Sequence, residues 1–181
     1  MRLMVYEFLA DGFEEIEALT TVDILRRAKI EIQTVSITAE KNVVGAHGIK
    51  VEADITADEM DLDTLDMVIL PGGLPGTLNL QASSVVKATL AYACAHHKFM
   101  AAICAAPSVL AGYGYLEGRH AVCNPGFEDK MPGAVLEHSA VSIDQNIITS
   151  RAAGTAHHFA FALLQALGTD PSALRKDMLY E

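Results

Sequence analysis

The stretch FMAAICAAPSVL, residues 99–110, decides the fold class of this chain. Its first five residues are apolar and predict a buried strand, and Pro107 is typical of the first turn of a helix. Cys104 therefore falls on a tight strand-to-helix turn, where α/β hydrolytic enzymes present a nucleophile. Free N–H groups at a helix start favour negative charge, so we expect this thiol to ionise more readily than an ordinary cysteine. The alternative is a buried structural cysteine.

The wider segment Phe99 to Leu116 is nearly uncharged and about long enough to span a bilayer. Pro107, Gly112 and Gly114 interrupt it, and burial on both sides of a strand, turn and helix explains its apolar character. We therefore expect no membrane helix here.

Length and composition limit the class of protein. The 181 residues predict a single domain over 1–181, and 51% hydrophobic against 20% charged residues argues against disorder. A net charge of −10 argues against nucleic acid and acidic membrane surfaces as partners. Three cysteines and a start, Met1–Tyr6, with a strand pattern and no signal peptide predict a cytoplasmic location.

Strand and helix patterns alternate along the chain. The expected strands and hairpins cover Leu3–Phe8, Glu31–Ile37, Val43–Val44 with Ile49–Ile55, Met67–Leu70, Phe99–Ile103, His120–Cys123, and Val141–Asp144 with Ile147–Ser150. The expected helices cover Glu14–Ala28, a segment from Ser83 or Ser84 to His97, and a last helix from Gly154 to Leu167. Short apolar strands separated by helices predict an α/β three-layer sandwich, a mostly parallel sheet with helices on both faces.

Apolar spacing also predicts which helix faces are buried. In the first helix the expected buried face carries Ile16, Leu19, Val22 and Leu25. Cys94 continues an apolar stripe on the second helix, which predicts an inert, buried thiol.

Ligands of such sheets bind beyond the carboxyl ends of the strands. We expect three segments to meet there: residues 11–17 after the first strand, residues 71–76 after the strand Met67–Leu70, and Cys104 with Ala105. Glycine after a strand leaves backbone N–H groups open to a ligand, so Gly73 and Ala105 are candidate donors to an oxyanion or to oxidised sulfur. The alternative for the glycine pair is a tight turn and nothing more.

Four motifs in register resemble the ThiJ/PfpI (DJ-one) superfamily, in the branch of the parkinsonism-associated protein deglycase and bacterial YajL. They are Gly12–Glu17 (GFEEIE), Leu70–Gly73 (LPGG), Ala102–Pro107 (AICAAP) and the run from Thr149 to Thr155. The resemblance runs from the first strand to the last helix. It implies a flavodoxin-like fold, a homodimer, Cys104 as nucleophile and Glu17 as its carboxylate partner.

That implied pair needs a protonated carboxyl, because an ionised glutamate would repel a thiolate. If Glu17 carries the proton, it can donate a hydrogen bond to sulfur or to a sulfinate, and the two groups titrate as one coupled unit. Without the resemblance, Glu17 reads as a surface residue. Glu14 and Glu15 are more simply solvated carboxylates that favour the helix dipole.

Three positions depart from relatives in the superfamily. Ala105 stands where protease-like members have a histidine, which argues against peptidase activity. Asn124 stands where several relatives place a histidine, and it can hydrogen-bond but cannot act as a base near neutral pH. His47 aligns roughly with an arginine near the active-site mouth, which puts an anion-binding role there in doubt. With Gly72, Asn124 and His47 are candidate pocket residues.

The remaining histidines and cysteines have ordinary explanations. His96 and His97 end a helix, and no spacing matches a zinc motif, so we expect no metal and no other cofactor. His157 and His158 could approach the site or a dimer partner, or lie in the core or at the surface. Cys123 ends a strand at the same sheet edge as Cys104; it is either a second thiol near the site, with a resolving disulfide as one option, or unrelated to it.

Three functional classes follow from these residues and the resemblance. The first is an enzyme of glyoxalase or deglycase type, in which Cys104 attacks methylglyoxal, glyoxal or an early adduct on protein or nucleotide and Glu17 moves protons. The second is a redox sensor or redox-dependent chaperone that responds to oxidation of Cys104. The third is a role in thiazole monophosphate or pyridoxal metabolism, and it ranks last because no phosphate-binding signature is visible.

Overall fold

A computed structural model describes residues 3–180. Its central sheet has seven strands in the order β10-β11-β7-β6-β1-β2-β5, and only β10 runs antiparallel to its neighbour. The strands are β1 (Met4–Leu9), β2 (Glu31–Ser36), β5 (Ile55–Thr56), β6 (Leu65–Leu70), β7 (Phe99–Ile103), β10 (Val141–Asp144) and β11 (Ile147–Ser150). Two small sheets pair β3 (Asn42–Val44) with β4 (Lys50–Glu52), and β8 (His120–Ala121) with β9 (Val135–Leu136).

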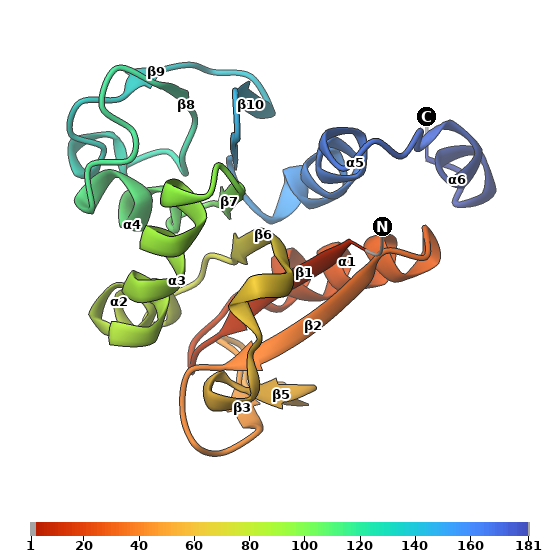
Figure 1. Cartoon of the computed structure of the whole chain (residues 1–181). Coiled ribbons are helices and arrows are strands. Elements are labelled where there is room, and N and C mark those ends of the chain that lie inside the picture. The colour runs from red at the N-terminus through yellow and green to blue at the C-terminus, as the bar shows by residue number, and fades with distance from the viewer. Residues whose placement is uncertain (1–2, 181) are drawn as a thin grey trace.

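Helices cover both faces of this sheet (Figure 1). One face carries α1 (Glu15–Arg27) and α5 (Ala156–Ala166), which contact each other, and the other carries α2 (Gly76–Ala82), α3 (Ser84–Ala95) and α4 (Pro107–Gly112). A short α6 (Ser172–Asp177) follows α5, and single 3-10 turns are η1 (Ala57–Glu59), η2 (Leu62–Thr64), η3 (Glu128–Lys130) and η4 (Ala153–Thr155). The predicted α/β three-layer sandwich is confirmed.

Each face of the sheet contributes to its own hydrophobic cluster. On β1, Tyr6 and Phe8 pack with residues of α3 and α4, whereas Val5 packs with residues of α1 and α5. Side chains of a strand alternate between its two faces, so burial on both faces explains the nearly continuous apolar runs of β6 and β7.

Several expected elements differ from the structure. The helix α2 was not expected, because seven residues that begin with glycine after a proline give too short a periodic pattern. The helix from Gly154 to Leu167 is not the last, since α6 follows it. The expected strand His120–Cys123 is the two-residue β8, which pairs with β9 outside the central sheet.

The predicted buried faces of two helices were partly wrong. Ile16 is 54% exposed and Leu19 is 36% exposed, whereas Val22 and Leu25 are buried. A spacing of three residues drifts around a helix with 3.6 residues per turn, so one end of such a stripe leaves the core. Cys94 is exposed for a related reason. A stripe of residues spaced four apart drifts around the helix in the opposite direction, so Ala93 and not Cys94 takes the buried position on α3.

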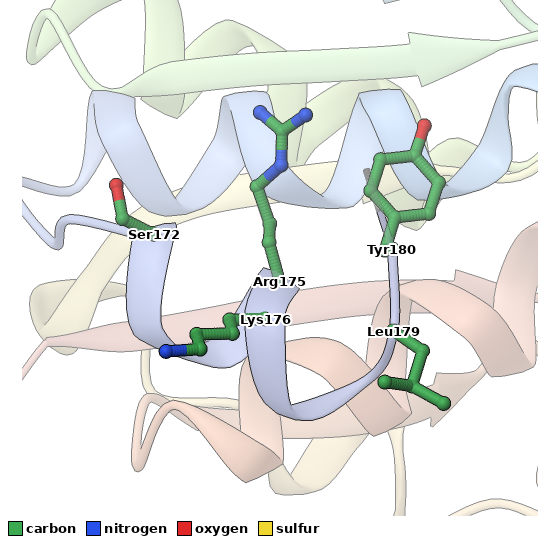
Figure 2. Close-up of a pocket in the computed structure, with 5 residues that line it drawn as sticks. All are labelled: Ser172, Arg175, Lys176, Leu179 and Tyr180. Atoms are coloured by element: carbon green, nitrogen blue, oxygen red, sulfur yellow. The ribbon is translucent and has the colours of Figure 1, made fainter.

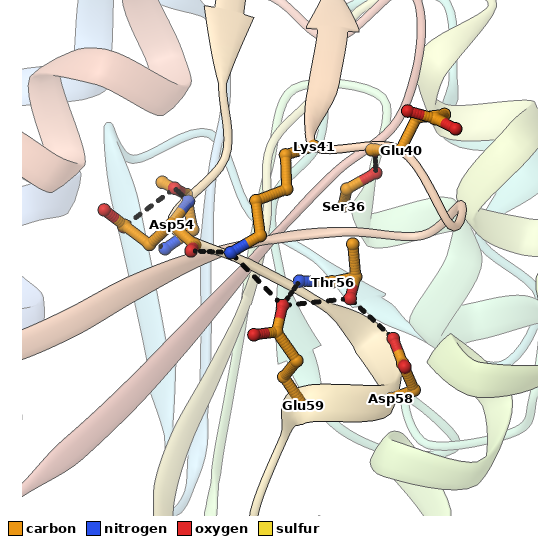
Figure 3. Close-up of polar contacts among 8 residues, drawn as sticks. Ser36, Glu40, Lys41, Asp54, Thr56, Asp58 and Glu59 are labelled. Carbon is orange, nitrogen blue, oxygen red and sulfur yellow. Dashed lines mark hydrogen bonds and ion pairs between the residues drawn. The ribbon is translucent and has the colours of Figure 1, made fainter.

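A polar network fixes the edge strand β5 (Figure 3). Lys41 Nζ donates to the carbonyl oxygen of Asp54 at 2.8 Å and lies 3.3 Å from Oε2 of Glu59. The same Glu59 oxygen accepts the backbone N–H of Thr56 at 2.8 Å. Charged side chains and satisfied backbone groups at this edge limit its pairing with another chain.

Among the described residues, no helix combines the length and the apolar character that a bilayer crossing requires. The apolar segment from Phe99 to Leu116 is instead β7, a turn and α4, as expected.

Candidate active site

Cys104 lies on the sharp turn between β7 and α4. Its φ of 67° is in the left-handed region, which costs a residue with a side chain about 1–3 kcal/mol. Hydrogen bonds hold this conformation: the N–H of Cys104 donates to the carbonyl of Ser150 on β11 at 3.0 Å, and the N–H of Ala106 donates to the carbonyl of Ile103 at 3.0 Å. The structure thus places Cys104 on the strand-to-helix elbow that its sequence predicts.

Glu17 reaches this thiol from the buried side of α1. The residue is 1% exposed, and its Oε2 accepts the N–H of Gly72 at 2.9 Å. A hydrogen bond between its carboxyl and the thiol of Cys104 influences the pKa of both groups. Glu17 is therefore an internal residue, not the surface carboxylate that its sequence alone suggests.

Gly72 makes this close approach possible. A Cβ at this position would lie 2.5 Å from Oε2 of Glu17 and 2.6 Å from Cβ of Cys104. Any other residue would therefore push the two reactive groups apart, so Gly72 does more than form a tight turn.

Burial dominates the acid–base chemistry of the pair. It raises the pKa of Glu17 to about 7, with the nearby Glu14 as a smaller cause in the same direction. Burial, followed by the negative charge of Glu17, raises the pKa of the Cys104 thiol to about 12. The expectation that the helix start makes this thiol more acidic by itself is wrong, because desolvation and a neighbouring carboxylate outweigh the backbone donors.

Two backbone N–H groups and one side-chain amide face the sulfur. The N–H groups of Ala105 and Gly73 both lower the pKa of Cys104, in opposition to burial. Asn124 Nδ2 donates to Sγ of Cys104 at 3.4 Å, and its own N–H donates to the carbonyl of Cys104 at 2.8 Å. Donors arranged in this way can stabilise a negative charge on sulfur or on an oxygen attached next to it.

Glu14 and Glu15 are not the solvated carboxylates expected. Glu14 is the N-cap of α1, and its Oε2 accepts the N–H of Glu17 at 2.7 Å. Glu15 is 4% exposed and binds His47 twice: Oε1 accepts the backbone N–H and Oε2 pairs with Nδ1, both at 2.7 Å. These contacts tie the hairpin of β3 and β4 to the start of α1.

His47 thus belongs to an ion pair with Glu15 at the start of α1. The hydrogen bond to Glu15 and the negative charge of Glu15 raise the pKa of His47. Burial acts to raise the pKa of Glu15, but the hydrogen bonds from His47 and from backbone N–H groups outweigh it and lower that pKa. One oxygen or nitrogen from each of Glu14, Glu15 and His47 lies within 4.8 Å of the others, a spacing that a cation could bridge. The direct contact between Glu15 and His47 already satisfies two of these three groups.

The other candidates from the sequence are Cys123, His157 and His158. Cys123 is a free, buried thiol, and burial raises its pKa to about 11. His157 stacks on Tyr180 at a ring separation of 5.4 Å, and the Tyr180 hydroxyl lies 2.9 Å from Nδ1 of His158. The two histidines therefore hold the segment after α6 against α5.

A shallow pocket of about 540 Å³ lies beside that segment, lined by Ser172, Arg175, Lys176, Leu179 and Tyr180 (Figure 2). None of these five residues is among the candidates from the sequence.

Glu7 is a buried residue that was not among the candidates from the sequence. It lies on β1, is fully buried, and neither of its carboxyl oxygens has a hydrogen-bond partner among the described residues. The available signal was a single charged residue inside the apolar run MVYEFL.

Known proteins of one family resemble this chain over most of its length. Residues 4–166 match the model of the DJ-1/PfpI family. The chain belongs to the DJ-1/PfpI family. The resemblance to the ThiJ/PfpI superfamily is thereby confirmed, and the flavodoxin-like fold with it.

Individual members of the DJ-1/PfpI family align over most of the chain. Protein DJ-1 homolog B of Arabidopsis thaliana is 35% identical over 161 residues, which cover 88% of this chain and 37% of that protein. The glutathione-independent glyoxalase DJR-1.2 of Caenorhabditis elegans is 31% identical over 156 residues, which cover 85% of this chain and 82% of that protein. The structure of oxidized Toxoplasma gondii DJ-1 superposes with a TM-score of 0.94 and 32% identity, over 98% of each chain. The chain thus spans about two fifths of the Arabidopsis relative.

Proposed function

We propose that this chain is a cofactor-independent enzyme of defence against reactive carbonyls. It converts methylglyoxal or glyoxal, or their early adducts on protein or nucleotide, into hydroxy acids. The observation that carries the proposal is a half-buried thiol beside a carboxyl whose pKa is about 7, with two backbone donors facing the sulfur. A base with a pKa near the working pH is the most effective at moving protons in both directions. The relative named as a glyoxalase supports the same reaction class.

In the first step the thiol adds to the aldehyde carbon of methylglyoxal. The bond between Sγ of Cys104 and this carbon forms as the thiol proton passes to the ionised carboxylate of Glu17. The carbonyl oxygen becomes an oxyanion, which the N–H groups of Gly73 and Ala105 stabilise until a proton from the acid converts it to a hydroxyl. The product is a hemithioacetal bound to Cys104.

In the second step Glu17 moves a proton between neighbouring carbons. As a carboxylate it removes the proton from the carbon bound to sulfur, and it returns a proton to the former ketone carbon. The hydroxyl proton of the hemithioacetal moves to the former ketone oxygen, so that a carbonyl forms next to sulfur and a hydroxyl on the neighbouring carbon. The result is a thioester of a 2-hydroxy acid on Cys104, with no net oxidation or reduction. Water then cleaves the thioester, which releases lactate and restores the thiol.

Lactate formation from methylglyoxal without glutathione tests this proposal. The wild type and Cys94→Ser should turn over equally, because Cys94 is an exposed thiol remote from the elbow. Cys104→Ser and Glu17→Gln should each lose at least about a hundredfold in kcat, the range for loss of a general base. Equal lactate formation by wild type and Cys104→Ser would refute the proposal.

A redox role is the second candidate, and the donors around sulfur favour it. Gly73, Ala105 and Asn124 could hydrogen-bond the oxygens of a Cys104 sulfinate, as could a protonated Glu17. One similar structure is that of an oxidized protein, which supports the same idea. Peroxide titration with mass spectrometry of the intact protein tests it: we expect two oxygens on Cys104, and loss of this product in Glu17→Ala. Preferential oxidation of Cys94 would contradict a sensor at Cys104.

We also propose that the chain acts as one domain within a cytoplasmic homodimer. Ile16 on α1 and Ile49 beside β4 are 54% and 51% exposed. Both lie near the contact between Glu15 and His47, so they offer an apolar surface beside the site. Sedimentation of the wild type and of Ile16→Glu would test this, with the variant expected to be monomeric.

A further inference from the structure

Glu7 faces the interior beneath α1. On β1 it has the same orientation as Val5, which packs with α1 and α5, and it lies opposite Ile69 of β6, which belongs to the same cluster. Its side chain is completely buried, and both of its carboxyl oxygens lack a hydrogen-bond partner. A carboxyl group in this position needs a physical explanation, because buried polar groups are nearly always paired.

The surroundings of Glu7 favour a neutral acid. Burial raises its pKa well above the usual value, Glu17 raises it further, and Arg26 opposes both. Arg26 is itself engaged by Asp54 at 2.6 Å. The flanking strands present Thr34 on β2 and Ile69 on β6, neither of which carries a charge. Burial without a hydrogen-bond partner favours the neutral form of Glu7, and the proton of a neutral carboxyl requires an acceptor.

Glu17 offers a matching acceptor. Its carboxyl meets the thiol of Cys104, and its Oε2 accepts the N–H of Gly72. Its Oε1 is buried, and no hydrogen bond is assigned to that atom among the described residues. Glu17 lies on the buried stripe of α1 with Thr21, whose hydroxyl donates to the Glu17 carbonyl, and this stripe faces the side of the sheet to which Glu7 points. Three unpartnered carboxyl oxygens thus belong to two residues on facing elements.

We propose that protonated Glu7 donates a hydrogen bond, directly or through one buried water molecule, to Oε1 of Glu17 and so holds that carboxylate in position toward Cys104. Glu7 is then a positioning residue, since it contacts Glu17 and not the reacting atoms. A neutral donor stabilises the ionised form of Glu17, which keeps this base available at neutral pH although it is buried. This inference depends on one part of the proposed function, namely that Glu17 acts as the base.

The test compares Glu7→Gln, whose amide can still donate, with Glu7→Leu, which cannot. The readout is the pH dependence of the rate at which iodoacetamide alkylates Cys104 in the full chain, measured by mass spectrometry. Glu7→Leu should shift the midpoint of the profile upward by about one pH unit, which corresponds to about tenfold slower alkylation at neutral pH. Glu7→Gln should stay close to wild type. A downward shift in Glu7→Leu would show that Glu7 is charged, and an unchanged profile would show that it only fills space. Either result overturns the proposal.

A second measurement covers the case that Glu7→Leu fails to fold. Infrared spectroscopy of the wild type at neutral pH should show the C=O stretching band of a protonated carboxylic acid, and Glu7→Gln should lose part of it. An unchanged band in Glu7→Gln would refute a neutral Glu7. Neither experiment uses a carbonyl substrate, so failure of lactate formation would overturn the proposed function and leave this inference standing.

Discussion

Neutralising Glu17 should make the protein more stable at neutral and alkaline pH while it removes the proposed activity. The change is Glu17→Gln, which keeps the size of the side chain and can still accept the N–H of Gly72. Glutamine cannot ionise, so it escapes the cost of a charge in a site that is 1% exposed.

The magnitude follows from the raised pKa. Burial moves the pKa of Glu17 from 4.5 to about 7, so the native state holds this proton more tightly than the unfolded chain does. Its contribution to stability is therefore complete below pH 4.5 and is lost as the pH rises to 7. At about 1.4 kcal/mol for each pH unit between the two values, the loss is on the order of 3 kcal/mol. The same loss applies whether the charge of the pair lies on Glu17 or on Cys104, because the number of bound protons is equal.

The assay is urea unfolding of wild type and Glu17→Gln at pH 5 and pH 8. The two proteins should differ little at pH 5, and the variant should be more stable by about 3 kcal/mol at pH 8. Glu15→Gln is the matched control, since Glu15 is also buried on the first turn of α1 but its pKa is lowered by His47. A lowered carboxyl pKa stabilises the native state above pH 4.5, so this control should be destabilised at pH 8.

The reasoning would be refuted if the stability gained by Glu17→Gln over wild type changed by less than about 1 kcal/mol between pH 5 and pH 8. Such a result would mean that Glu17 titrates like an ordinary carboxyl, and the base proposed for the reaction would then have no unusual pKa. A control that changes in the same direction as Glu17→Gln would point to a general effect of pH on unfolding.

Two further predictions concern the surroundings of the pair. Gly72→Ala should slow Cys104 alkylation at least about tenfold and lower stability by about 1–3 kcal/mol, because its Cβ would lie 2.5 Å from Oε2 of Glu17. Gly154→Ala is the control: a Cβ there meets nothing within 4 Å, so both the alkylation rate and the stability should stay unchanged. Normal alkylation in Gly72→Ala would show that the pair does not depend on this close approach. The raised pKa of His47 means that its pairing with Glu15 stabilises the hairpin at low pH and weakens as the pH rises through that pKa. Proteolysis within residues 42–52 should therefore increase over this interval in the wild type and show no such step in His47→Ala, and identical pH profiles would contradict the role of this pair.

The sequence was sufficient for the layers of the fold and for the main residues of the site. Alternating buried strands and helices predict the sandwich, and the apolar run before Cys104 with Pro107 after it predicts the elbow. The place of Glu17 beside the thiol came from the family resemblance, because nothing in the spacing of α1 alone distinguishes Glu17 from Glu14 or Glu15.

The environment of each group could not be predicted from local pattern. Glu15 reads as a surface carboxylate, but the loop that carries His47 folds over it from 32 residues away. Ile16 reads as a core residue, but the drift of its stripe around α1 leaves it exposed. For Cys104, the helix start predicts an acidic thiol, whereas the depth of burial is a tertiary property and acts in the opposite direction.

The raised pKa of Cys104 also determines which reaction step Glu17 must perform. A raised thiol pKa leaves less thiolate at pH 7 than an ordinary cysteine has, so a mechanism that begins from free thiolate would be slow. A carboxylate with a pKa of about 7 can accept the thiol proton during attack on a carbonyl carbon, and the same burial that raises its pKa makes the resulting acid stable. The transfer converts a carboxylate and a thiol into an acid and a sulfur nucleophile within one buried site. Burial therefore suppresses the resting thiolate and at the same time provides the base that generates it when a substrate is present.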